Sequence, residues 1–143
     1  MKIIIILFAN LFLWVGLNDQ SAKSITGKWT LYYFHDLTAN IKSYRPANYS
    51  DGPLSFEFID DGVNGEMKGT TTTNQVRGQY TLNNEKIEFE NFGGTKIGEH
   101  GWGSNFWQTI TKSSSYKINN DTLRILYDTN SKEMVFYKTE IRK

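Results

Sequence analysis

Short segments in which apolar and polar residues alternate recur along this chain, and sequences typical of tight turns separate them. Residues 54–59 are the clearest case, because Leu54, Phe56 and Phe58 alternate with other residues. A period of two is characteristic of a β-strand with one face against a core. The turn sequences Asp60-Asp61-Gly62 and Asn83-Asn84 follow such segments. Strands and turns at this spacing predict an antiparallel sandwich or barrel.

Eight short strands are expected, at residues 28–34, 54–59, 63–70, 75–82, 86–90, 116–118, 122–127 and 134–138. Residues 105–111 carry the apolar stripe of a helix, with Ser104 as its N-cap. The expected fold class is therefore all-β with one short helix, a small eight-stranded antiparallel barrel. Aromatic rings should fill the interior of so small a barrel. The expected core consists of Trp29, Leu31, Tyr33, Phe56, Phe58, Tyr80, Leu82, Phe89, Tyr116, Ile118, Leu123, Ile125 and Phe136.

Residues 1–22 have the features of a secretory signal peptide. Lys2 supplies a positive charge, and residues 3–17 form an apolar run shorter than the roughly 20 residues of a membrane-spanning helix. Ser21 and Ala22 are small residues suited to cleavage, and an uncleaved N-terminal anchor is the alternative. We expect cleavage to leave one domain at residues 23–143 without a stable membrane span. The chain has no Cys and therefore no site for a lipid-modified Cys, so a periplasmic or secreted location is expected.

The charge distribution and the absence of Cys argue against several classes of function. The 16 basic and 15 acidic residues are intermixed, so a nucleic-acid partner is not indicated. Without Cys, thiol catalysis and zinc–thiolate sites are excluded.

The two histidines, His35 beside Asp36 and His100 beside Glu99, do not form a chelate motif. The glycine-rich residues 93–103 lack the ending of a P-loop, and no Gly-x-Ser-x-Gly motif is present. We expect no cofactor, no metal and no catalytic residues. A hydrolase built from residues distant in the sequence is the least favoured alternative.

Two long connections, residues 35–53 and 91–103, interrupt the pattern of strands and turns. Loops on a rigid barrel carry function more often than its strands do, and Tyr, Trp and Arg often anchor interfaces. The candidate binding residues are Tyr44, Arg45, Tyr49, His100 and Trp102. Tyr32, Phe34 and Tyr137 also lie outside the inward-facing stripes. These aromatic residues either line a binding patch or a pocket mouth, or are buried where the loops cover the barrel ends.

The order of the motifs resembles the META domain, the fold of the bacterial heat-shock protein HslJ and its relatives. The matching motifs are Trp29-Thr30-Leu31, Leu54-Ser55-Phe56, residues 69–74 ending in Asn74, Gly78-Gln79-Tyr80, Thr95, residues 106–110, Tyr116-Lys117-Ile118, Asp121-Thr122-Leu123 and Met134-Val135-Phe136. The family's frequent Cys residues, one before the Asn and one after the Thr loop, are absent; Thr73 and Gly98 stand near those places. The resemblance implies an envelope- or stress-linked, non-enzymatic protein.

Gly27-Lys28-Trp29 is also similar to the Gly-x-Trp start of lipocalins, whose barrels have eight strands as well. Lipocalins carry their helix after the last strand, whereas here it is expected between the fifth and sixth strands. We therefore expect a monomeric, exported META/HslJ-like protein that acts through binding or surface contacts. Its expected partner is an unknown protein or a small apolar ligand, and a lipocalin-like binder of such a ligand is the second choice.

Overall fold

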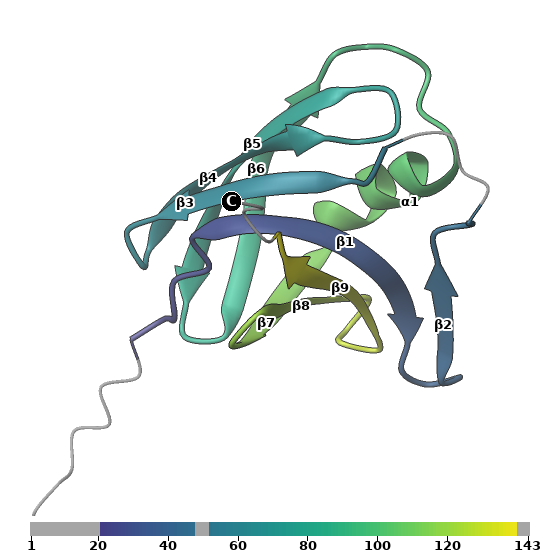
Figure 1. The fold of residues 1–143 in the computed structure, drawn as a ribbon. Coiled ribbons are helices and arrows are strands. Elements are labelled where there is room, and N and C mark those ends of the chain that lie inside the picture. Colours follow the sequence, from purple (N-terminus) through teal and green to yellow (C-terminus); the bar gives the residue numbers. More distant parts are fainter. Residues whose placement is uncertain (1–20, 48–51, 140–143) are drawn as a thin grey trace, which may run out of the picture.

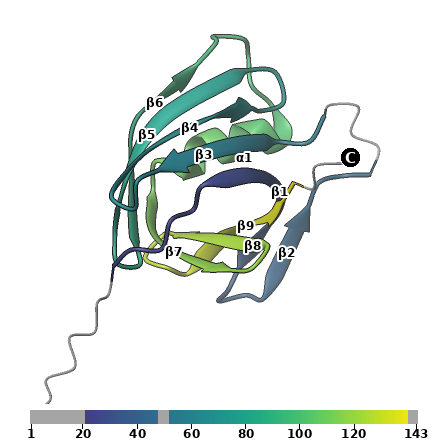
Figure 2. The same cartoon turned by 60° about the vertical axis from the view of Figure 1, so that its left-hand side comes forward.

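A computed structural model describes residues 21–47 and 52–139. Its elements, in chain order, are β1 (Gly27–Asp36), β2 (Ile41–Tyr44), β3 (Ser55–Asp60), β4 (Asn64–Thr70), β5 (Gln75–Asn83), β6 (Lys86–Gly94), α1 (Gly101–Ile110), β7 (Ser113–Asn119), β8 (Thr122–Tyr127) and β9 (Lys132–Lys138) (Figure 1). Neighbouring strands are antiparallel throughout, and β9 pairs back onto β1. The sheet therefore closes in a ring. Helix α1 lies at one end of this ring, between β3–β6 on one side and β1 and β7–β9 on the other (Figure 2).

The all-β class with one short helix is confirmed, but the expected number of strands is too low by one. The additional strand, β2, lies within the expected connection at residues 35–53 and pairs with the second half of β1. Every residue of β2 is exposed. This strand has no inward-facing apolar stripe, so the pattern that marks the other strands is missing from its sequence.

The helix begins at Gly101, earlier than expected, and its N-cap is His100 rather than Ser104. The sequence of residues 101–103 suggests a loop because two of the three are glycines, which are poor helix formers. Burial of Trp102 offsets that preference, since its ring packs edge-on against Phe34 at a centroid distance of 5.1 Å. At Gly103 a side chain would meet the Glu99 carboxylate and the Thr72 hydroxyl, so the close approach requires glycine.

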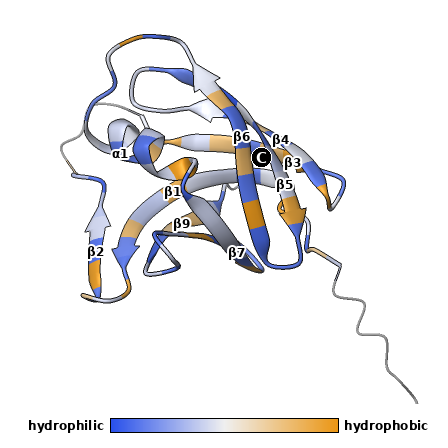
Figure 3. Cartoon of the chain, turned by 180° about the vertical axis from the view of Figure 1, so that it is seen from behind, coloured by the Kyte–Doolittle hydropathy of each residue, from blue (hydrophilic) through white to orange (hydrophobic). Residues whose placement is uncertain are grey.

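Aromatic rings fill the interior. Every residue of the expected core is buried except Ile118, which is partly buried and packs against the core. The Phe56 ring stacks on Phe106 of α1 at 4.3 Å, and the Tyr80 ring lies 5.6 Å from both Phe58 and Phe89. The alternation of apolar and polar residues that produces this core is visible along β6 (Figure 3).

The segment before β1 is fixed to the ring. Ile25 is fully buried, and its N–H donates to Asp60 Oδ2 at 3.0 Å. The Trp29 indole N–H donates to the Ile25 carbonyl at 2.9 Å, and the Tyr116 hydroxyl donates to the Lys23 carbonyl at 2.6 Å. Residues 1–20, which hold most of the expected signal peptide, lie outside the described residues. Within residues 21–47 and 52–139, no helix has the length and apolar character needed to cross a membrane.

Candidate functional site: an exposed tyrosine patch on β1, β2 and β9

Three exposed tyrosines from three different strands meet on the outer surface. Tyr32 of β1, Tyr44 of β2 and Tyr137 of β9 are 55%, 53% and 39% exposed. The Tyr32 ring lies 6.1 Å from Tyr44 and 5.0 Å from Tyr137, with both pairs nearly perpendicular. We call these three residues the tyrosine patch. Perpendicular rings of this kind attract each other through their quadrupoles, which favours a defined arrangement even at the surface.

The pairing of β1 with β9 has a β-bulge at Tyr32. Leu31 pairs with Phe136 of β9 and Tyr33 pairs with Val135, so Tyr32 is an extra residue in β1. Such a bulge re-aims a side chain and locally increases the twist of the strand. Tyr32 points outward because it alternates with two buried neighbours, Leu31 and Tyr33.

Buried Tyr33 links the patch to β2. Its ring lies 5.2 Å from the Tyr44 ring, and Lys42 Nζ lies 5.0 Å from its centroid. The second contact is a cation–π interaction, which at an exposed site is worth about 0.5–1 kcal/mol. Lys42 and Tyr44 therefore lie on the same face of β2, which we call its tyrosine face.

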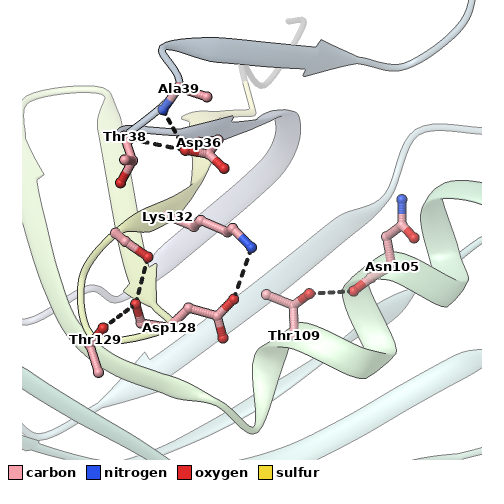
Figure 4. Close-up of polar contacts among 9 residues, drawn as sticks. Asp36, Thr38, Ala39, Asn105, Thr109, Asp128, Thr129 and Lys132 are labelled. Atoms are coloured by element: carbon pink, nitrogen blue, oxygen red, sulfur yellow. Dashed lines mark hydrogen bonds and ion pairs between the residues drawn. The ribbon is translucent and has the colours of Figure 1, made fainter.

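The turn that joins β1 to β2 is held by polar contacts. Asp36 Oδ1 accepts the N–H groups of Thr38 and Ala39 at 3.0 and 2.8 Å (Figure 4). The Leu37 N–H donates to the Ser131 carbonyl at 2.9 Å, which ties this turn to the one between β8 and β9. In that second turn Lys132 pairs with Asp128 at 3.2 Å, as Figure 4 also shows.

A buried polar cluster lies beside Tyr33. Glu133 of β9 is only 3% exposed, and its Oε1 contacts Arg124 Nη1 at 2.8 Å and His35 Nδ1 at 3.0 Å. The second ring nitrogen of His35 lies 3.2 Å from Asn40 Oδ1 in the β1–β2 turn. The Glu133 carboxylate on β9 is thus bonded to His35 of β1 and to Arg124 of β8, the two strands that pair with β9. The cluster positions β2 relative to β9.

A second polar network joins the β4–β5 turn to the segment before α1. Asn74 is 3% exposed; its Nδ2 donates to the Ile97 carbonyl at 2.9 Å and to Glu99 Oε2 at 2.7 Å. Its Oδ1 accepts from the Thr95 hydroxyl at 2.8 Å and from the Ile97 N–H at 3.0 Å. One amide therefore holds a whole loop in place.

Glu99 is the charged member of that network. Burial acts to raise the pKa of Glu99, but hydrogen bonds from Asn74, Thr71, Thr73 and Thr72 outweigh burial and hold it below the ordinary value. The Thr73 hydroxyl also donates to the Gly98 carbonyl at 3.1 Å. These donors all come from one turn, so the carboxylate serves as the connection between the two loops.

The expected binding residues fall in different places. Tyr44 belongs to the tyrosine patch, and exposed Arg45 follows it directly. Exposed His100 precedes α1, whereas Trp102 is 6% exposed and packs on buried Phe34, so its ring belongs to the core. Tyr49 lies outside the described residues.

The patch combines Tyr44 with two residues that were not among the five candidates. Tyr32 and Tyr137 stand out in the sequence only as aromatic residues at outward strand positions, and their meeting depends on the closure of β9 onto β1. Among the residues that the structure describes, no group of three or more His, Cys, Asp or Glu side chains is arranged to hold a metal ion.

Comparison with known proteins gives the family. A model of the META domain matches residues 24–141. The chain belongs to the META domain family. Among curated proteins, none matches this sequence. Motif residues that are far apart in the sequence contact each other in this META domain. The Thr95 hydroxyl donates to Asn74, and the Thr73 hydroxyl donates to the Gly98 carbonyl. The two positions that stand near the family's frequent Cys residues are therefore neighbours in space.

Solved structures share the fold of this META domain. A protein from Burkholderia xenovorans, determined by NMR, is 16% identical over 79% of this chain and 81% of its own, with a TM-score of 0.57. A DUF4847 family protein from Bacteroides vulgatus, determined by crystallography, is 11% identical over 80% of this chain and 95% of its own, also with a TM-score of 0.57. At identities this low, the two structures show a shared fold and nothing about function.

Proposed function

We propose that this META-domain protein is a non-enzymatic protein of the cell envelope, or a secreted one, that binds a partner protein through the tyrosine patch. The observation that carries the proposal is the convergence of Tyr32, Tyr44 and Tyr137 from three strands onto one exposed surface. Tyrosine supplies a large, rigid contact area with a polar tip, which is why it is frequent in interface hot spots.

The surroundings of the patch support a protein partner. Leu37 and Ile41, in and beside the β1–β2 turn, are 41% and 60% exposed. They add exposed apolar area at the turn end of the β1–β2 hairpin, whose other end carries Tyr44. The perpendicular rings do not form the flat platform on which a planar ligand would stack.

Catalysis receives no comparable support. The META domain is not a known enzyme family. His35 is engaged by Glu133 and Asn40, and the carboxylate of Glu99 is engaged by the β4–β5 turn. A general base with its donors and acceptors already committed to neighbouring strands is poorly suited to abstract a proton from a substrate.

A lipocalin-like role receives less support than surface binding. A small apolar ligand would need internal volume, and in this ring the positions facing inward are occupied by rings in contact with each other. Most of the residues that line an open groove at the β5–β6 turn are charged or polar, among them Lys23, Asn84, Glu85 and Lys86. Such a lining does not suit an apolar ligand.

Export is part of the proposal. Cleavage after Ala22 would leave Lys23 and Ile25, whose backbone groups anchor the chain to Tyr116 and Asp60. The mature chain would therefore keep these contacts. Mass spectrometry of the protein purified from its own host should give a chain that starts near residue 23, and an intact Met1 on a cytosolic protein would contradict export.

Copurification tests the binding role. Wild-type protein and the variants Tyr44→Ala and Tyr137→Ala are purified from the host, together with Ile59→Ala, a control that truncates an exposed side chain on β3. Native mass spectrometry should find one stoichiometric protein with the wild type and the control but not with the two patch variants. A stoichiometric small molecule that survives both patch substitutions would favour the lipocalin-like alternative instead.

A further inference from the structure

Strand β2 contributes nothing to the core, yet it is kept in an extended conformation beside the tyrosine patch. All four of its residues are exposed. We infer that β2 is a docking edge, to which a partner adds an extended acidic segment as a further antiparallel or parallel strand. The inference rests on the proposed function and names the chemistry of the partner at the same surface.

The edge of β2 is the first reason. Within the described residues β2 lies at one end of the strand order and has β1 as its strand neighbour. In an antiparallel pair, alternate residues direct their N–H and C=O groups away from the partner strand. A strand with such a free edge is a template for an added strand, and extended peptides bind to many domains in this way.

The rigidity of β2 is the second reason. A two-stranded hairpin without core packing is marginal in water, yet this one is fixed at several points. The Asp36 carboxylate closes the turn, Leu37 bonds to Ser131, and Asn40 contacts His35, which is in turn bonded to buried Glu133. These contacts give no burial to β2 itself. They pre-form an edge, and a pre-formed edge lowers the entropic cost of binding.

Charge selects the partner. Strand β2 itself contains one basic residue, Lys42, and no acidic residue. The nearby Asp36 carboxylate is occupied by backbone N–H groups of the turn. A lysine on an edge strand discourages pairing with a segment of like charge, including β2 of a second copy of this chain. An acidic segment is complementary to the same edge.

The two faces of β2 define the side-chain pattern of the added strand. Lys42 and Tyr44 lie on the tyrosine face, as their contacts with Tyr33 demonstrate. Ile41 and Ser43 lie on the other face by alternation, and Ile41 is 60% exposed. The matching segment alternates acidic and aromatic residues on one face with apolar residues on the other.

A short synthetic peptide tests the inference directly. The probe is acetyl-Glu-Val-Phe-Val-Glu-amide, titrated into ¹⁵N-labelled protein consisting of residues 23–143. There are two control peptides: one is N-methylated at all five residues and lacks backbone N–H donors on both edges, and the other has Lys in place of both Glu residues. The protein variants are Lys42→Glu and, as a matched exposed control on β7, Lys117→Glu.

Strand addition predicts that the amide signals of residues 41–44 shift and that their hydrogen exchange slows. Binding of the N-methylated peptide and of the Lys peptide should be weaker by about tenfold, because the first loses backbone hydrogen bonds and the second its charge complementarity. Lys42→Glu should lose affinity for the Glu peptide and gain affinity for the Lys peptide, whereas Lys117→Glu should behave like the wild type.

Two outcomes would overturn the inference. The first is binding of all three peptides with equal affinity, and the second is the absence of any change at residues 41–44 at saturating peptide. Either result would leave the proposed function standing if Tyr44→Ala and Tyr137→Ala still abolish copurification of the host partner. Loss of that patch dependence, with strand addition intact, would instead refute the proposed function.

Discussion

Replacing Asn74 with Ala tests whether a single buried amide holds the loop before α1. The substitution removes a side chain that is 3% exposed and bonded to Ile97, Thr95 and Glu99. It keeps the backbone hydrogen bond from the Thr71 N–H to the carbonyl of residue 74, so the turn itself remains possible.

The magnitude follows from the four bonds just named. A net loss of about 1 kcal/mol for each hydrogen bond gives about 4 kcal/mol. Water that enters beside the partly exposed Glu99 recovers part of this, so we expect a loss of about 3 kcal/mol, a large fraction of the stability of an ordinary domain.

Urea unfolding followed by tryptophan fluorescence measures the change. The midpoint should fall while the slope of free energy against urea stays the same, because the variant exposes about as much surface on unfolding as the wild type does. Asn119→Ala, at an exposed position at the end of β7, is the control and should change stability by no more than about 0.5 kcal/mol. A loss of less than about 1 kcal/mol for Asn74→Ala would refute the idea that this amide organises the loop.

Three further changes probe the core, the helix start and the effect of pH. Phe56→Ala removes a ring that stacks on Phe106 and should cost about 3–5 kcal/mol in urea unfolding; a loss below about 1 kcal/mol would place Phe56 outside the core. Gly103→Ala should destabilise the protein by about 1–3 kcal/mol, because its Cβ meets the Glu99 carboxylate, whereas Gly93→Ala, with open space around it, should be nearly neutral; equal effects would contradict the packing at Gly103. Burial raises the pKa of Tyr127 from 10.0 to about 12. The stability due to this shift is therefore fully present below pH 10 and is lost as the pH rises through about 12. Tyr127→Phe should lose less stability than the wild type over this alkaline range. An unchanged dependence of stability on pH would argue against burial of a neutral hydroxyl at this position.

The strands that face the core were predictable because burial imposes a period of two on their sequences. Leu54, Phe56 and Phe58 alternate in the sequence and are buried in the structure for the same reason. Strand β2 was not predictable in this way, since it buries none of its residues and is held by contacts of Asp36, Leu37 and Asn40 that depend on the folded ring.

The candidate site was predictable in part. Tyr44 attracts attention as an aromatic residue in a long connection, and it does lie in the patch. Sequence reasoning also selected Trp102, but its exposure depends on where α1 begins, and the early start of the helix turns this ring onto Phe34. The meeting of Tyr32 with Tyr137 depends on the long-range pairing of β1 with β9, which leaves no local pattern in the sequence.

The proposed role of this protein depends on contacts made through the tyrosine patch. Site-specific photo-crosslinking in the host tests it most directly, with a benzoylphenylalanine residue replacing Tyr44, Tyr137 or, as a control, the exposed Ile59 of β3. The two patch positions should crosslink to the same host protein, and the β3 position should not. Crosslinks to a common partner from position 59, with none from positions 44 and 137, would contradict it.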